Sequence, residues 1–245
     1  MSENDRFRVD HDGHVARVTL CQGDEGNTVA PPDMRSLGAA IREAGSDTAT
    51  KIVLLTGEGA DFCLGRRHVP GVARPTKARD FRQRIPGAIL GVYQDVRETP
   101  VPVLAAVQGR AQGFGCALVA QCDIAIAEAA ALFSLPEMDA NLPPTLAISA
   151  CLPKMPAKAV LHMVLTRGTV DATQALNWGL VSEVTSAGGL GAAIDAYLAK
   201  LVDRDRDALI AIKEYMGLAP GMAPEGAARY AANLIATEMT SQGED

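Results

Sequence analysis

The sequence predicts an α/β fold whose first half alternates strands with helices and whose second half is largely helical. Before Leu146, short apolar segments that fit strands alternate with longer segments of helical periodicity. From Leu146 onward, apolar residues recur at helical spacing. A length of 245 residues fits one large domain, or one domain with a small appendage. We therefore expect residues 1–190 to form the core and residues 191–245 a C-terminal helical region.

Five short strands are expected in the first half. Each is either an apolar run or an alternation of apolar and polar residues: 15–20, 51–56, 103–107, 123–127 and 132–134. A glycine-rich turn follows the third of these strands, and a short apolar helix is expected to start at Cys116.

Two helices are expected between these strands. Asp33 should cap the first, whose apolar residues follow at helical spacing. The second has one apolar face from Phe81 to Val96 and should end before Pro100. Residues 66–84 are polar and basic and contain prolines, so we expect a mobile loop there.

The second half has five segments of helical pattern: 157–165, 172–178, 190–202, 206–218 and 225–239. Gly179 fits the stop of the second of these helices. No long linker separates the segments from the first half, so we expect the helical tail to pack on the core.

Composition excludes several classes of function. The chain has 23 Lys and Arg against 29 Asp and Glu, a net charge of −6, which disfavours nucleic-acid binding. Aromatic residues make up only 4% of the chain, so the core must be built from small side chains. The start of the sequence has no apolar signal-peptide core, and no uncharged apolar run reaches the ~18 residues of a membrane span.

The cysteines indicate neither a metal site nor a disulfide framework. They number five, an odd count, with no Cys-x-x-Cys spacing and no histidine nearby. We therefore expect the cysteines to be small, buried, free thiols, and we expect the protein to be located in a reducing cytoplasm.

Two motifs and their spacing carry a family resemblance. The first is GEGADFCLGR at 57–66, and the second is VQGRAQGFGCAL at 107–118, followed by Cys122-Asp123 and by FSLPE at 133–137. Together with the segment 172–181, they resemble the crotonase superfamily, the enoyl-CoA hydratase/isomerase family, over residues 8–240. The resemblance implies a spiral of ββα units, a helical C-terminal region, and homotrimers or hexamers made of two trimers. It also implies an acyl-CoA thioester substrate in fatty acid metabolism, with coenzyme A as part of that substrate and no permanently bound cofactor.

The resemblance further implies an oxyanion hole. The family stabilises a thioester enolate with two backbone N–H groups, which fall here on Arg66 and Phe114. Losing one such donor typically costs ~3–4 kcal/mol of transition-state stabilisation. Position 114 departs from the family, which often has glycine there, so the ring of Phe114 either packs in the core or faces the substrate. Gly113 should contact the substrate through its backbone.

One carboxylate stands where the family's hydratases have two. The first glutamate of the pair falls on Ala117 and the second on Glu137, which lies among apolar residues. Burial there would raise the pKa of Glu137 from ~4.3 and suit it to proton transfer; the alternative is an ordinary surface residue. Asp139 either caps the next segment or acts as a second acid.

A basic segment follows the first motif and begins with Arg66, Arg67 and His68. Three interpretations stay open: the segment solvates a loop and meets CoA phosphates, Arg67 or His68 binds a polar acyl group, or His68 is an acid or base. Leu64 of the first motif is a further expected substrate contact. Lys213 is expected to help bind CoA, because family members often carry a lysine there.

These residues favour an enoyl-CoA double-bond isomerase that uses Glu137 alone. The alternatives are a hydratase or lyase on an unusual polar acyl-CoA, and a non-catalytic acyl-CoA-binding member of the family. Ala117 and Phe114 are the features that favour the last of these.

Overall fold

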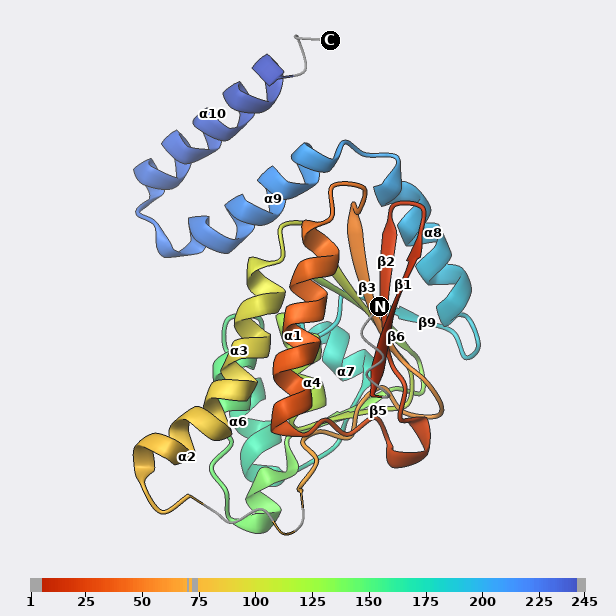
Figure 1. The fold of residues 1–245 in the computed structure, drawn as a ribbon, viewed down its shortest axis with the longest axis vertical. Coiled ribbons are helices and arrows are strands. Elements are labelled where there is room, and N and C mark those ends of the chain that lie inside the picture. Colours follow the sequence, from red (N-terminus) through yellow and green to blue (C-terminus); the bar gives the residue numbers. More distant parts are fainter. Residues whose placement is uncertain (1–5, 70, 72–74, 242–245) are drawn as a thin grey trace.

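A computed structural model describes residues 6–69, 71 and 75–241 of the chain. Arg74 of the basic segment lies outside these residues. The main element is a six-stranded sheet (Figure 1). Its strands, in spatial order, are β1 (Phe7–Asp12), β2 (Val15–Leu20), β3 (Ile52–Gly57), β4 (Val103–Val107), β6 (Ile124–Glu128) and β9 (Glu183–Thr185). Only the β1–β2 pair is antiparallel.

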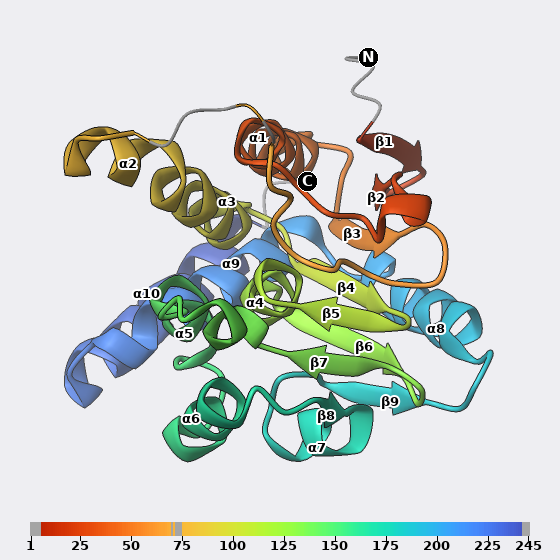
Figure 2. The ribbon, with the colours of Figure 1, turned by 90° about the horizontal axis from the view of Figure 1, so that it is seen from below.

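A smaller sheet lies beside the large one (Figure 2). It is formed by β5 (Arg110–Gln112), β7 (Leu132–Ser134) and β8 (Val170–Asp171). The chain places β4 in the large sheet, β5 in the small sheet and then forms α4 (Phe114–Gln121). It repeats the course with β6, β7 and, after the 3-10 turn η2 (Pro136–Ala140), α5 (Thr145–Cys151). This is the spiral of ββα units that the resemblance implies.

The two faces of the large sheet are covered by different helices (Figures 1 and 2). The larger core lies under α1 (Pro31–Ser46), α3 (Pro86–Glu98) and α4, and small residues such as alanine, valine and cysteine dominate it. The other face packs against Ile194 and Leu198 of α8 (Leu190–Val202). Strand residues alternate between the two clusters, as the two-residue period of a strand requires.

The region from 66 to 98 differs from the expectation. Residues 78–84 form a helix, α2 (Ala78–Arg84), where a loop was predicted. The predicted long helix is broken before Pro86, because proline has no N–H for an intrahelical bond and instead occupies the first position of α3. Asp33 was wrongly predicted as a cap: α1 starts at Pro31, and Asp33 lies in its first turn.

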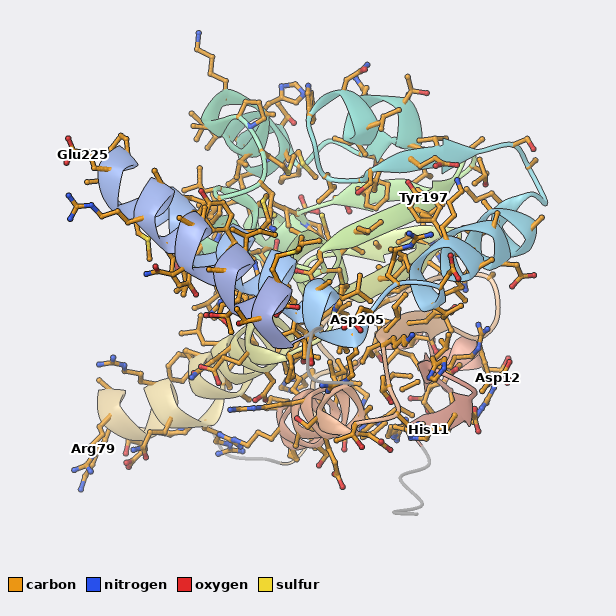
Figure 3. The ribbon with its side chains drawn as sticks, turned by 90° about the horizontal axis from the view of Figure 1, so that it is seen from above. His11, Asp12, Arg79, Tyr197, Asp205 and Glu225 are labelled. Atoms are coloured by element: carbon orange, nitrogen blue, oxygen red, sulfur yellow. The ribbon has the colours of Figure 1, made fainter. Side chains whose placement is uncertain are left out.

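The remaining helices largely match their predicted bounds. They are α6 (Ala157–Thr166), α7 (Ala172–Asn177), α9 (Arg206–Leu218) and α10 (Pro224–Ser241), with the short 3-10 turns η1 (Gly23–Glu25) and η3 (Ala219–Gly221). In Figures 1 and 3, α10 lies beside α9 at the edge of the fold, with Glu225 at its outer end. Within the described part of the chain, no helix combines the length and hydrophobicity needed to cross a bilayer.

Candidate active site

The two sequence motifs, 57–66 and 107–118, are joined by backbone hydrogen bonds, and we call the place where they meet the seam. The N–H of Cys63 donates to the carbonyl of Arg110 (3.2 Å), and the N–H of Gln112 donates to the carbonyl of Cys63 (2.9 Å). Gly65 lies so close to the second motif that an added Cβ would come within 2.9 Å of the Gln112 carbonyl and 3.7 Å of the Phe114 nitrogen. Its φ of 103° also lies where glycine is favoured. Glycine at position 65 therefore brings the backbones of the two motifs together.

Among the residues that the structure describes, two backbone N–H groups have no acceptor where the two motifs meet. The Gly65 carbonyl and the Arg67 N–H both pair with Val29, at 3.0 and 2.9 Å, so the N–H of Arg66 between them points the other way. Phe114 is the first residue of α4, where N–H groups have no intrahelical acceptor. Neither N–H donates to another described residue. Both predicted oxyanion donors are therefore free at the seam.

An ion pair between Asp61 and Arg110 links the two motifs. The guanidinium of Arg110 donates from Nε to Oδ1 of Asp61 (2.9 Å) and from Nη2 to Oδ2 (2.7 Å), and the Arg110 backbone N–H donates to Oδ1 as well (2.9 Å). These hydrogen bonds hold the pKa of the Asp61 carboxyl below its usual range. The amide of Asn27 donates to the Asp61 carbonyl (2.8 Å) and fixes the same turn from the opposite side.

Glu137 reaches the seam through the small sheet. The parallel pairing of β5 and β7 ends at Gln112 and Ser134, and the N–H of Gly113 donates to the Ser134 carbonyl (2.9 Å). The chain then turns through η2, which contains Glu137. A Cβ at Gly113 would lie 2.9 Å from Oε1 of Glu137, so a side chain at this position would displace the carboxylate.

The carboxylate of Glu137 is held in an apolar setting. Burial raises the pKa of Glu137, and its own backbone N–H partly offsets that shift. Its Oε2 is buried and has no hydrogen-bond partner among the described residues. Ala117, one turn into α4, is fully buried and carries no polar group. Asp139 is exposed and pairs with Arg167 (2.8 Å), so its carboxylate is engaged away from Glu137.

Two groups near Glu137 were not anticipated from the sequence. Tyr93 of α3 stacks on Phe114, with ring centroids 6.1 Å apart and planes 12° apart. Cys116 and Cys151 are both buried, and the proximity of Cys151 together with burial raises the pKa of Cys116. A weak signal existed for Tyr93, because helical spacing places it on the buried face of α3. No local pattern links Cys116 to Cys151.

The side chain of Arg67 turns away from the seam toward acidic residues. Its Nη2 lies 3.1 Å from the Asp33 carboxylate and its Nη1 lies 3.7 Å from the Glu25 carboxylate. Its Nε is buried without a partner among the described residues. This network ties the segment after the first motif to α1 and η1.

The other predicted contact residues have separate surroundings. The side chain of Leu64 packs against Gly26, where an added Cβ would lie 2.4 Å from its Cδ1. The side chains of Arg66 and His68 are exposed. The structure therefore brings together the backbones of Arg66, Gly113 and Phe114 with the carboxylate of Glu137, but not the side chains of the basic segment.

The amine of Lys213 is fully engaged inside the protein. It lies 2.8 Å from the Asp123 carboxylate and donates to the carbonyls of Val96 (3.0 Å) and Val101 (3.1 Å). Its side chain is only 8% exposed. These contacts fix α9 to the end of α3 and to the start of β6.

Two other features of the described residues bear on this assignment: the grouping of metal-ligand side chains and a surface depression. Among them, no three histidine, cysteine or carboxylate side chains are grouped to hold a metal ion. A depression of about 450 Å³ lies between α8 and the sheet, lined in part by Arg17, Glu128 and Asp195. It meets the two motifs only at Gly57 and Gln108, and neither Arg66, Phe114 nor Glu137 lines it.

Comparisons with known proteins agree with the fold and the motifs. A sequence profile described as Enoyl-CoA hydratase/isomerase matches residues 10–243. A probable enoyl-CoA hydratase of Rhizobium meliloti (strain 1021) is 31% identical over 179 residues, covering 73% of this chain and 68% of the relative. The mouse mitochondrial enoyl-CoA hydratase domain-containing protein 3 is 29% identical over 69% of this chain, and the match spans only 56% of that protein's length.

Solved structures show the same architecture along nearly the whole chain. The crystal structure of enoyl-CoA hydratase from Mycobacterium smegmatis superposes with a TM-score of 0.89 at 26% identity, covering 96% of this chain and 91% of the other. DspI of Pseudomonas aeruginosa gives a TM-score of 0.86 at 26% identity, covering 97% and 90%. With the profile matching nearly end to end, the chain belongs to the enoyl-CoA hydratase/isomerase family of the crotonase superfamily.

Proposed function

We propose that this protein isomerises the double bond of an enoyl-CoA thioester and uses Glu137 as its only proton carrier. The thioester oxygen accepts hydrogen bonds from the backbone N–H groups of Arg66 and Phe114. The N-terminal end of α4 adds positive potential at that oxygen. Enolate charge developing there is stabilised by donors already in place, each typically worth ~3–4 kcal/mol.

The reaction needs one base that becomes one acid. The Glu137 carboxylate takes a proton from the α-carbon of a 3-enoyl-CoA, and the electron pair of that C–H bond moves toward the adjacent carbonyl, placing negative charge on the thioester oxygen of a dienolate that is conjugated with the double bond. The protonated Glu137 then returns the proton to the γ-carbon as the double bond shifts, so no atom is gained or lost. Burial raises the pKa of Glu137, which makes its carboxylate a stronger base for the first of these two steps.

One observation carries this proposal: the Glu137 carboxylate lies above Gly113, the residue before the donor Phe114, with Oε2 buried and unpartnered. Ala117 supports a single-carboxylate mechanism, since a buried methyl group cannot hold or polarise a water molecule.

The test is Glu137→Gln, with Asp139→Asn as the matched control two residues away. Isomerisation of a 3-enoyl-CoA, followed by the absorbance of the conjugated product, should vanish in the first variant and persist in the second. Binding of a saturated acyl-CoA should persist in both. Undiminished turnover by Glu137→Gln would remove Glu137 from the mechanism.

Hydration is the second candidate, and the names of relatives favour it. The Rhizobium meliloti relative is named a probable enoyl-CoA hydratase, and a Salmonella typhi relative, 28% identical over 94% of this chain, is named carnitinyl-CoA dehydratase. Product analysis separates the two reactions. A hydroxyacyl-CoA formed from a conjugated enoyl-CoA supports hydration, whereas a migrated double bond supports isomerisation.

A further inference from the structure

Two aromatic rings lie on the buried side of the proposed site. Phe114 and Tyr93 are stacked, and they are 4% and 1% exposed. The chain is poor in aromatic residues, with five Phe, four Tyr and one Trp, so a stacked pair at this place stands out against a core of small side chains. Displacing either of two buried, stacked rings would disturb the packing of its neighbours.

The position of the pair relative to the reacting atoms follows from the backbone. In the proposed mechanism, the N–H of Phe114 donates to the thioester oxygen. The ring of Phe114 is attached to the same residue and therefore lies close to the acyl group. Burial is the main reason why the pKa of Tyr93 is raised, and the neighbouring Cys151, Cys116 and Glu137 raise it further. The phenol therefore lies among the groups that surround the proton carrier.

The direction of the acyl group follows from the exposure of the site. Coenzyme A is large, polar and anionic, so it must leave the seam toward water, where the side chains of Arg66 and His68 are exposed. The acyl group attached to the same carbonyl then points the opposite way, into the region enclosed by α3, α4 and α5. That is the region that Phe114 and Tyr93 occupy.

We propose that the stacked rings of Phe114 and Tyr93 end the acyl-binding region and restrict the protein to short acyl-CoA thioesters. This inference rests on the proposed function and names its substrate class. A long chain would have to displace one of two rings packed at core density, and overpacking of this kind is unfavourable. A short acyl group reaches Glu137 without moving either ring.

The test is binding of saturated acyl-CoAs, which does not depend on turnover. Isothermal titration of the protein with butyryl-CoA and with decanoyl-CoA should show at least about tenfold tighter binding of the shorter ligand. Phe114→Ala should shift this ratio toward decanoyl-CoA by about tenfold or more, because it opens the end of the acyl region while keeping the backbone N–H.

Three further variants separate the ring pair from other effects. Phe114→Leu removes less volume and should shift the ratio in the same direction by less. Tyr93→Phe keeps the ring and should keep the wild-type preference, since volume and not the hydroxyl sets it. Leu90→Ala on the exposed side of the same helix removes a large apolar side chain away from the pair and should change nothing.

Different results would overturn the length limit alone or the proposed function as well. Equal or tighter binding of decanoyl-CoA by the wild-type protein would overturn the length limit while leaving the proposed function standing. An unchanged ratio in folded Phe114→Ala and Phe114→Leu would also overturn it. If neither acyl-CoA binds, both the length limit and the proposed function fail.

Discussion

The carboxylate of Glu137 occupies the side of Gly113 where a side chain would otherwise begin. A methyl group added at Gly113 would stand 2.9 Å from Oε1, and the residue also has a φ of 51° that side chains disfavour. Gly113 therefore places the proposed proton carrier, Glu137, beside the turn that presents the Phe114 N–H.

Gly113→Ala is expected to lower turnover by about a hundredfold, because displacing a reacting group by an ångström has that order of effect. The positive φ should cost a further ~1–2 kcal/mol of stability. Steady-state kinetics and urea unfolding measure the two effects. Gly91→Ala is the control: nothing lies within 4 Å of its added methyl group, so it should gain ~0.5–1 kcal/mol and keep full activity. Normal activity of Gly113→Ala would contradict this placement of Glu137.

Asp61→Asn should weaken the ion pair that holds the two motifs together. It removes the charge that binds Nε and Nη2 of Arg110, and we expect a loss of ~1–2 kcal/mol in stability, since Arg110 is half exposed. Displaced oxyanion donors should lower kcat by about tenfold with little change in KM, as expected for an interaction made in the transition state. Asp10→Asn, in the exposed pair with Arg8, is the control. Equal loss of kcat in both variants would show that the Asp61 pair has no special role.

Glu137 should give the stability a distinctive dependence on pH. Its pKa in the folded protein lies above the ordinary 4.5, so the folded state favours the protonated form and loses stability as pH rises from below 4.5 through the raised pKa. Glu137→Gln, which has no such charge, should therefore be more stable than the wild type at neutral pH, and the gain should disappear near pH ~4. Melting temperatures across this range measure it. A gain that is the same at every pH would contradict the assignment.

Lys213→Met should destabilise the protein without weakening acyl-CoA binding. The ammonium has three acceptors and is nearly buried, so its loss leaves Asp123 and two carbonyls with fewer partners, at a cost of ~2–3 kcal/mol. Urea unfolding measures the loss, and titration with butyryl-CoA measures the binding. Weakened binding at unchanged stability would instead support the CoA contact expected from the family.

Five of the strands and the long helices were predictable because burial leaves a pattern in the sequence. Strand β4 is buried on both faces and is a continuous apolar run, and the bounds of α8 and α9 agree with their apolar spacing. Four strands were missed. Strands β5, β8 and β9 have only two or three residues each, and β1 is mostly exposed, so none of them leaves a clear apolar pattern. The basic helix α2 buries no residue and so leaves no apolar period to detect.

The candidate active site was also only partly predictable from the sequence. The motifs predicted that Arg66, Phe114 and Glu137 form one site, and the structure brings them close together, while their roles in catalysis stay a prediction. The Asp61–Arg110 pair and the Tyr93–Phe114 stack join residues that the fold alone brings together, and no local pattern announces them. The sequence indicated a basic segment that could meet the substrate, whereas the structure commits Arg67 to Asp33 and Glu25.

Proton exchange at the α-carbon of a saturated short acyl-CoA tests the central claim most directly. Butyryl-CoA has no double bond to move, so incorporation of solvent deuterium at its α-carbon reports enolate formation alone. We predict steady incorporation by the wild-type protein and none by Glu137→Gln, with butyryl-CoA bound in both cases. Bound butyryl-CoA that gains no deuterium in the wild-type protein, or gains it equally with Glu137→Gln, would contradict a single-glutamate enolate mechanism.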